Sequence, residues 1–188
     1  MAEKLYLEAQ DLLSDAMRLG AMVFQSGFRP DFIVGIWRGG TPVGIAVQEV
    51  LAWAGLETDH IAIRTSSYAQ GIDNRDHKVR VHGLRYLVDR VEAEHRLLLV
   101  DDVFDTGLTI QAIVDKLRSK ARLNTPHDIR VAVPWYKPSR IRVDRKPDYV
   151  LHETEQWIKF PHSLEGLTRE EIRRHRPEIY AILHEAEK

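Results

Sequence analysis

Short apolar runs alternate along the chain with stretches whose apolar residues recur at helical spacing. Leu12, Leu19 and Val23 belong to one such helical stripe, which predicts a helix over about residues 7–26. Short, mainly apolar runs predict buried strands. These runs cover residues 31–36, 61–64, 97–100, 128–133 and 148–152.

Helices are expected between these strands. One is predicted from Val43 to Trp53 and another from Ile110 onward, because apolar residues in both segments fall at helical spacing. Thr168-Arg-Glu-Glu171 is a capping-box signature and opens a C-terminal helix over about residues 168–186, which Pro177 interrupts or kinks. Strands that alternate with helices predict an α/β fold with a mostly parallel central sheet flanked by helices.

Length and composition limit the alternatives. The 188 residues fit one domain spanning 1–188, and a net charge of −1 gives no reason to expect a nucleic-acid or membrane partner. The chain has no cysteine, which excludes disulfides, thiolate metal sites and a cysteine nucleophile. The first residues lead into an amphipathic segment rather than an apolar signal core, so we expect a cytoplasmic protein.

The most informative stretch is Leu97–Ile110, which reads LLLVDDVFDTGLTI. A buried strand is followed at once by three carboxylates, then by Thr-Gly-Leu-Thr and a helix. A glycine-containing turn at a helix N-terminus exposes backbone N–H groups to an anion, so Thr106, Gly107 and Thr109 are candidates for holding a phosphate. Ribose hydroxyls or a divalent cation would suit the neighbouring carboxylates.

Two other segments carry candidate chemistry. Arg38-Gly39-Gly40 lies between a predicted strand and a predicted helix, and it is either an anion site or a tight turn with a surface arginine. Residues 65–78 are polar and have neither helical nor strand periodicity. This segment is either a functional loop or an exposed hairpin tip.

Val100-Asp-Asp-Val-Phe-Asp-Thr-Gly-Leu-Thr109 resembles the signature of the type I phosphoribosyltransferases, which bind 5-phosphoribosyl-1-diphosphate (PRPP). The alternative, a buried strand that ends in a solvated acidic turn, does not explain three acids followed by Thr-Gly-x-Thr. The resemblance covers about residues 31–161. It implies the type I phosphoribosyltransferase fold, with a flexible hood loop at about 65–82 that closes over PRPP.

The resemblance also implies roles for individual residues. Asp101 and Asp102 would engage ribose hydroxyls and Mg²⁺, with Asp102 the better metal ligand, and Asp105 would be the catalytic base that accepts the purine N7 proton. The Trp37–Arg38 peptide bond is the candidate for a cis bond. The PRPP-binding residues that it implies are Arg38, Gly39, Ser67, Tyr68, Arg75, Lys78, Asp101, Asp102, Val103, Phe104, Asp105, Thr106, Gly107, Leu108 and Thr109.

Two downstream residues point to the acceptor. Lys137 resembles the lysine of the 6-oxopurine (hypoxanthine or xanthine–guanine) phosphoribosyltransferases that donates to O6 of the base. The pair Trp157-Ile158 resembles their aromatic–aliphatic pair, in which the ring stacks on the purine. The alternatives are a solvated loop lysine and a tryptophan buried in the core. Either Ser163 or Glu165 stands where related enzymes carry an acid near the 2-position of the base, so the preferred 6-oxopurine stays open.

The resemblance therefore implies a Mg²⁺-dependent purine salvage enzyme that uses PRPP and a purine base and works as a dimer or tetramer. Two other functions keep the same PRPP site. One is a phosphoribosyltransferase for another nucleobase, such as adenine, orotate or uracil. The other is a non-catalytic regulator that senses PRPP.

Overall fold

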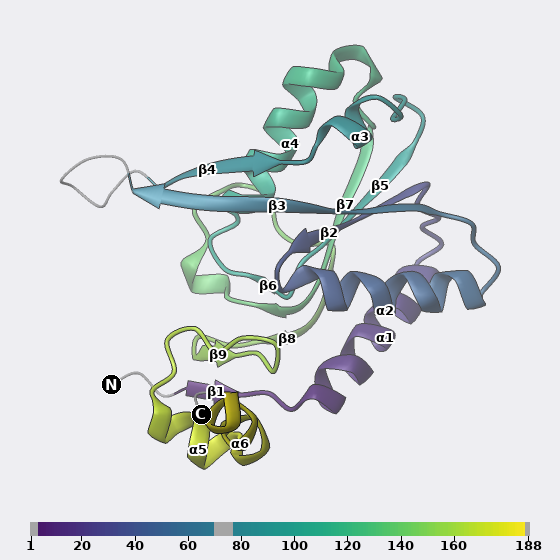
Figure 1. Ribbon diagram of the computed structural model, residues 1–188. Helices are drawn as coiled ribbons and strands as arrows, with labels where there is room; N and C mark the ends of the chain where they lie inside the picture. Colours follow the sequence, from purple (N-terminus) through teal and green to yellow (C-terminus); the bar gives the residue numbers. More distant parts are fainter. Residues whose placement is uncertain (1–3, 70–76, 187–188) are drawn as a thin grey trace. The chain divides into compact units, whose positions relative to one another are not determined.

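A computed structural model describes residues 4–69 and 77–186. The chain separates into two compact units (Figure 1). The larger unit comprises residues 12–155, and the smaller unit combines the N-terminal residues up to 11 with those from 156 onward. The expectation of a single domain over 1–188 stays a prediction.

The larger unit is built on a sheet that has seven strands in the described part of the chain. Their order is β4-β3-β2-β5-β7-β6, and β8 also pairs with β7. Every pairing is parallel except that of β3 with β4, which confirms the predicted mostly parallel sheet. The strands are β2 (Phe32–Trp37), β3 (Asp59–Ala69), β4 (His77–His82), β5 (Arg96–Val100), β6 (Val103–Phe104), β7 (Asp128–Tyr136) and β8 (Tyr149–Glu153).

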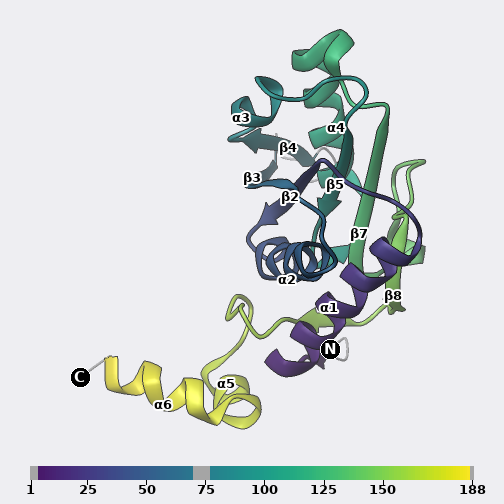
Figure 2. The same ribbon diagram turned by 90° about the vertical axis from the view of Figure 1, so that its right-hand side faces the viewer.

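Helices flank both faces of this sheet, as Figure 2 shows for α2 (Gly40–Trp53) and α4 (Leu108–Ala121). Helix α1 (Ala9–Gln25) packs on α2, where the backbone of Gly20 approaches Val47 and Val50. The short α3 (Arg85–Val88) was not expected from the sequence. Two 3₁₀ turns follow α4 and β7, at Arg122–Asn124 and Pro138–Arg140.

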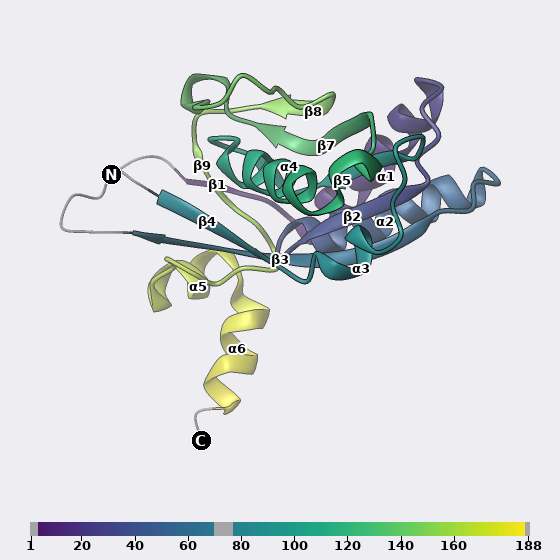
Figure 3. The same cartoon turned by 90° about the horizontal axis from the view of Figure 1, so that it is seen from above.

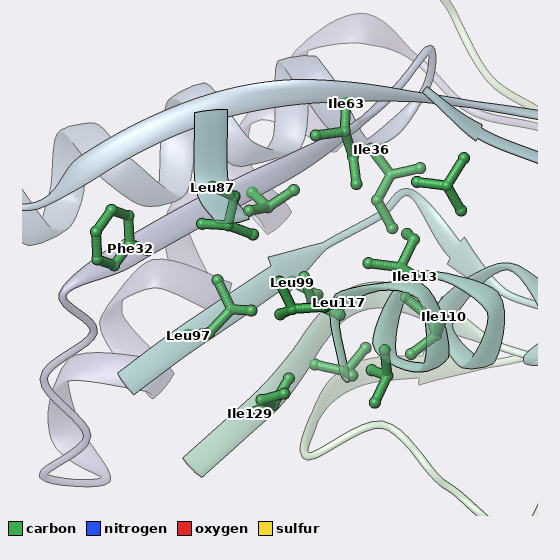
Figure 4. Close-up of a cluster of buried hydrophobic side chains, with 14 of the residues drawn as sticks. Phe32, Ile36, Ile63, Leu87, Leu97, Leu99, Ile110, Ile113, Leu117 and Ile129 are labelled. Atoms are coloured by element: carbon green, nitrogen blue, oxygen red, sulfur yellow. The ribbon is translucent and has the colours of Figure 1, made fainter. Parts of the chain in front are cut away.

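The main hydrophobic core lies between the sheet and α4 (Figure 4). Alternate residues of the central strands, among them Leu97 and Leu99 of β5, point toward Ile113 and Leu117 of α4, and all four are fully buried. Strand residues alternate between the two faces, so the other residues of the same strands face α2. Both faces of the central strands are thus covered, which explains their continuous apolar runs.

Strands β3 and β4 form a long antiparallel hairpin at one edge of the sheet, visible in Figure 3. The sequence predicted a strand over 61–64 and showed no periodicity over 65–78. The strand is longer than predicted, since Thr65 to Ala69 belong to β3, and His77 and Lys78 belong to β4. The polar residues there pair with β4, in a ladder that runs from Arg64 opposite His82 to Ala69 opposite His77. Cross-strand hydrogen bonds stabilise this segment, which lacks apolar periodicity.

The smaller unit contains a two-stranded parallel sheet of β1 (Lys4–Tyr6) and β9 (Trp157–Lys159). The expected capping box is present, with Thr168 and Glu171 bonded reciprocally. It opens α5 (Arg169–His175), and Pro177 begins a separate helix α6 (Pro177–Ala186), so Pro177 interrupts the predicted helix. No helix within residues 4–69 or 77–186 is long and apolar enough to cross a membrane.

Candidate functional site

Three loops of the larger unit leave the carboxyl ends of neighbouring parallel strands. Gly35 of β2 pairs with Val100 of β5, and Val100 pairs with Ala132 of β7, so the three strands are parallel neighbours whose carboxyl ends lie on the same side of the sheet. Ligands of open α/β sheets bind beyond these strand ends. The loops carry the residues singled out by the sequence: Arg38 and Gly39 after β2, residues 101–109 after β5, and Lys137 after β7.

The loops after β2 and β5 are packed against each other. A Cβ atom added to Gly39 would lie 1.8 Å from Oδ2 of Asp102, and one added to Gly40 would lie 2.4 Å from the carbonyl oxygen of Val100. Both positions therefore require glycine. The Trp37–Arg38 peptide bond is cis, as the resemblance suggested, and the Arg38 side chain is exposed beside this contact.

Asp101 and Asp102 place two carboxylates next to each other. Burial raises the pKa of Asp101 well above its ordinary value, and the adjacent Asp102 charge raises it further. The Asp102 N–H donates to Oδ1 of Asp101 at 3.0 Å. Two adjacent carboxylates form a donor set suited to Mg²⁺, which takes few protein ligands and completes its shell with water and phosphate oxygens. Among the described residues, no three His, Asp or Glu side chains form a metal-binding cluster.

The turn after Asp105 leads directly into α4. Gly107 precedes the helix with a φ of 78°, a conformation that favours glycine. A Cβ atom there would also lie 2.4 Å from the side chain of Val143, so both the backbone conformation and the available space require glycine. The hydroxyl of Thr106 accepts from the Leu108 N–H at 3.4 Å. The first N–H groups of a helix have no acceptor within it, so this turn directs donors outward, as an anion site needs. Val103 and Phe104 form the short strand β6 just before it.

Lys137 and Asp105 lie close together at the other end of this loop. The Lys137 side chain is buried, with 4% of the residue exposed, which excludes the solvated loop lysine. Its Nζ lies 4.0 Å from Oδ2 of Asp105, and the Lys137 N–H donates to the Phe104 carbonyl at 2.9 Å. Burial lowers the pKa of Lys137 below its ordinary value, and the Asp105 charge offsets part of this effect.

Two charged residues beside the Asp105–Lys137 pair were missed by the sequence analysis: Arg140, which contacts Asp105, and Glu155, whose charge acts on Lys137. Nε of Arg140 lies 2.9 Å from Oδ1 of Asp105. Glu155 accepts hydrogen bonds from the N–H and the hydroxyl of Ser139, and these bonds lower its pKa. For Arg140 the sequence offered one signal, the turn Lys137-Pro-Ser-Arg140. A turn brings a residue three positions downstream back toward its start, here the charge of Arg140 toward Lys137.

The proposed hood residues are only partly described. Ser67 and Tyr68 lie within β3 rather than after a strand, and the backbone of Tyr68 pairs with that of Lys78 in β4. Arg75 lies outside the described residues. The flexibility of the hood and the binding role of these residues stay predictions.

Trp157 and Ile158 belong to β9 of the smaller unit. Trp157 has 54% of its surface exposed, which excludes the alternative of a buried core tryptophan, whereas Ile158 is buried. The Lys159 ammonium lies 5.4 Å from the centre of the Trp157 ring, a cation–π contact that helps to orient it. Lys159 itself donates to the carbonyl of Glu165 at 2.8 Å.

The family model described as "Phosphoribosyl transferase domain" matches residues 4–167, which is most of the chain. The chain therefore belongs to the phosphoribosyltransferases, and the resemblance inferred from the residue 100–109 motif is confirmed. Members of this family generally use Mg²⁺ together with PRPP. A search among curated proteins finds no match.

Solved structures share this fold. A purine phosphoribosyltransferase from Pyrococcus horikoshii is 24% identical, with a TM-score of 0.67 over 88% of this chain and 97% of its own. A hypothetical protein from Neisseria gonorrhoeae with bound ppGpp is 17% identical, with a TM-score of 0.72 over 100% and 99% of the two chains. A xanthine–guanine–hypoxanthine phosphoribosyltransferase from Helicobacter pylori is 18% identical, with a TM-score of 0.59 over 84% and 92%. These similarities establish the type I phosphoribosyltransferase fold.

Proposed function

We propose that this protein is a purine salvage enzyme that transfers the 5-phosphoribosyl group of PRPP to a 6-oxopurine, namely hypoxanthine, guanine or xanthine. The products are the nucleoside 5′-monophosphate and pyrophosphate. One observation carries the choice of acceptor: a buried lysine ammonium, that of Lys137, lies 4.0 Å from the carboxylate of Asp105. This pair offers a hydrogen-bond donor and an acceptor side by side.

The pair matches one edge of a 6-oxopurine. O6 and N7 are neighbours on that edge, and O6 is an acceptor. The Lys137 ammonium would donate to O6 while Asp105 accepts the N7 proton. Adenine carries an amino donor at position 6, which a buried ammonium would repel. The geometry therefore favours hypoxanthine, guanine or xanthine over adenine.

The other half of the site would bind PRPP. Thr106, Gly107 and Thr109 would hold the 5′-phosphate through hydroxyls and backbone N–H groups at the start of α4. Val103, Phe104 and Leu108 would belong to the same PRPP-binding loop. Asp101 and Asp102 would hold the ribose hydroxyls and Mg²⁺, and bound Mg²⁺ would neutralise charge on the pyrophosphate.

The remaining PRPP contacts come from the loop after β2 and from the hood. Arg38 and the backbone at Gly39 would bind pyrophosphate and stabilise its charge as it leaves. Ser67, Tyr68, Arg75 and Lys78 would close over the substrate. Closure excludes water, which would otherwise compete with the purine for the sugar.

The reaction then needs one bond broken, one bond formed and one proton moved. The C1′–O bond to pyrophosphate breaks, and its electron pair leaves with pyrophosphate. N9 of the purine bonds to C1′, and Asp105 accepts the N7 proton as positive charge develops on the ring. We propose that Trp157 stacks on the purine and that the backbone of Ile158 reads its other edge. The resemblance of this pair to the purine enzymes supports these roles.

The resemblance also supports two properties of the working enzyme. We propose that it acts in the cytoplasm and as a homo-oligomer, a dimer or a tetramer. Sedimentation velocity at micromolar concentration tests the second property, and a single monomeric species would contradict it.

The ppGpp bound to the Neisseria protein raises a second candidate function. A guanine nucleotide with two diphosphate groups combines a 6-oxopurine with phosphates, which are the groups that the two halves of this site would bind. The protein would then be a nucleotide sensor without turnover. A transferase for adenine, orotate or uracil is the third candidate, and the buried charge of Lys137 argues against it.

A panel of nucleobases separates these candidates. Purified protein with PRPP and Mg²⁺ is incubated with each base in turn, and the pyrophosphate and nucleotide formed are measured, with ppGpp binding measured by calorimetry. Turnover of at least one 6-oxopurine is the expected result. Turnover of adenine or orotate alone would overturn the acceptor assignment. Binding of PRPP or ppGpp with no turnover of any base would establish the sensor instead.

A further inference from the structure

Two consecutive residues of the loop between β7 and β8 contact two consecutive residues of the turn that precedes α4. The Arg142 N–H donates to the Thr106 carbonyl at 3.0 Å. The next residue, Val143, lies so close to Gly107 that a Cβ atom on Gly107 would be 2.4 Å from its Cγ2. The turn proposed to hold the 5′-phosphate is therefore supported by a segment that is distant in the sequence.

The backbone contact sets the direction of a hydrogen-bond donor. In a planar trans peptide unit the C=O and the N–H point in opposite directions. The Thr106 carbonyl is directed at the Arg142 N–H, and the peptide bond between Thr106 and Gly107 is trans. The Gly107 N–H belongs to that same peptide unit, so it points away from the supporting segment. It is one of the donors proposed to hold the 5′-phosphate.

Gly107 needs a restraint from its surroundings to keep this conformation. Its φ is 78°, and glycine adopts negative φ values about as readily as positive ones. The atoms nearest to a Cβ built on Gly107 belong to the side chains of Val143 and Phe104. Phe104 comes from the same loop as Gly107 and is buried, so Val143 is the contact that comes from outside this loop.

The segment that carries Val143 is itself anchored. Ile141 and Val143 are partly buried against the main hydrophobic core, whereas Arg142 between them is exposed. Further along, the Arg145 guanidinium donates to the Ile129 carbonyl of β7 at 2.9 Å. A restraint from an anchored segment is in place before any ligand binds, so the ligand does not have to order the turn.

We propose that Val143 is a positioning residue for the 5′-phosphate site, which keeps Gly107 in the conformation that directs its N–H toward the phosphate. This inference rests on the proposed function, in which the 5′-phosphate binds at this turn. Val143 acts through Gly107 and does not touch the phosphate itself.

Fragments of PRPP test this role by calorimetry. Ribose 5-phosphate carries the phosphate proposed to bind at Gly107, whereas pyrophosphate with Mg²⁺ would occupy the other end of the site. Val143→Ala should weaken the binding of ribose 5-phosphate and of PRPP about tenfold, because the ligand then has to order the glycine backbone. The affinity for pyrophosphate with Mg²⁺ should stay the same.

Two further variants separate positioning from a general loss of stability. Val150→Ala is the matched control, since Val150 of β8 is also partly buried against the main core. Both alanine variants should lose stability, but only Val143→Ala should lose affinity for ribose 5-phosphate. Val143→Thr keeps the β-branched shape that lies against Gly107 and should bind ribose 5-phosphate nearly as tightly as the wild type does.

Backbone NMR relaxation of Gly107 follows the restraint without any ligand. The order parameter of its amide should be about 0.85 in the wild type and in Val150→Ala, and it should fall toward about 0.6 in Val143→Ala. A Gly107 amide that is equally rigid in Val143→Ala would overturn the proposal, as would an unchanged affinity for ribose 5-phosphate. An equal loss of pyrophosphate affinity would also overturn it, because the whole site would then be disturbed.

The two proposals fail in different ways. A wild-type protein that binds ribose 5-phosphate but turns over no 6-oxopurine refutes the proposed function, and the comparison of Val143→Ala with Val150→Ala still decides the positioning role. An active wild type whose Val143→Ala variant binds ribose 5-phosphate equally well refutes the positioning role alone. A wild type that binds neither PRPP nor ribose 5-phosphate refutes both.

Discussion

Gly39 and Asp102 are in such close contact that a Cβ atom on Gly39 would lie 1.8 Å from the Asp102 carboxylate oxygen. The two residues come from loops after different strands, β2 and β5, which end side by side in the sheet. The contact joins the loop proposed for pyrophosphate to the loop proposed for ribose and Mg²⁺. A structural change in one of these two loops should therefore alter the other loop as well.

Gly39→Ala should weaken PRPP binding because Asp102 has to move away from the added methyl group. Ribose and Mg²⁺ would draw the Asp102 carboxylate back toward the added methyl group, so strain of about 1–3 kcal/mol opposes binding. This strain corresponds to roughly a tenfold loss of affinity or more. Calorimetry with PRPP and Mg²⁺ measures the effect. Gly27→Ala is the control: its φ of 81° makes alanine costly to stability, but no atom lies within 4 Å of the added Cβ. Equal PRPP affinity in Gly39→Ala and the wild type would refute the predicted coupling.

Asp101→Asn should stabilise the protein at neutral pH while it impairs the reaction. The pKa of Asp101 is raised on folding, so the folded state binds its proton more readily than the unfolded state does. The charged carboxylate therefore destabilises the fold as pH rises through the raised pKa. Asparagine removes this charge and can keep the hydrogen bond from the Asp102 N–H.

Thermal or urea unfolding at several pH values measures this gain. We expect a gain on the order of 1 kcal/mol at pH 7, since an uncompensated charge at a functional site is a common cause of lost stability. The gain should shrink as the pH falls toward the ordinary range of an aspartate. A variant that is less stable than the wild type at pH 7 would contradict this account of the acidic pair.

Deprotonation of Lys137 should weaken purine binding at alkaline pH. Its pKa is lowered by burial, so the ammonium loses its proton at a lower pH than an ordinary lysine does. The KM for hypoxanthine should then rise as pH rises through this lowered pKa. Lys137→Arg keeps its charge over the whole range and serves as the reference, because ionisation of hypoxanthine itself affects both proteins equally. Parallel pH profiles for the two proteins would exclude Lys137 from this role.

Arg176 should stabilise the loop after β9 in the smaller unit. Its guanidinium donates to the carbonyls of Lys159, Phe160, Pro161 and Ser163 at 2.7–3.4 Å. Arg176→Ala leaves these acceptors without their charged partner, which costs roughly 1–3 kcal/mol. Hydrogen exchange of residues 159–163 should become faster, whereas Arg174→Ala, which removes an exposed arginine of α5, should leave it unchanged. Exchange that is equally slow in both variants would show that Arg176 is dispensable.

The sequence was sufficient to predict the central sheet and the position of the acidic loop. The run 97–100 is apolar throughout because both faces of β5 are covered, and it changes abruptly to acids where the strand ends. Such changes in composition can be recognised in a single sequence. The glycines of the two loops were also visible, although the reason for Gly39, its contact with Asp102, was not.

Features that depend on distant pairing were not predictable. β1 and β9 are strands of three residues, too short to show any periodicity, and each exists because it pairs with the other. The polar end of β3 is a strand because β4 lies beside it. The turn after β7 indicated that Arg140 folds back toward Lys137, but the ion pair of Arg140 with Asp105 joins two loops that are distant in the sequence, and no local pattern specifies that contact.

A competition between bases tests the central claim most directly. The protein is mixed with PRPP, Mg²⁺ and equal concentrations of hypoxanthine and adenine, and the two nucleotides formed in the same tube are quantified by mass spectrometry. Asp105→Asn serves as the control and should make product about 10²–10⁴ times more slowly, as expected for the loss of a general base. Our account predicts that the wild type forms mainly inosine 5′-monophosphate. An excess of adenosine 5′-monophosphate over inosine 5′-monophosphate would contradict this account.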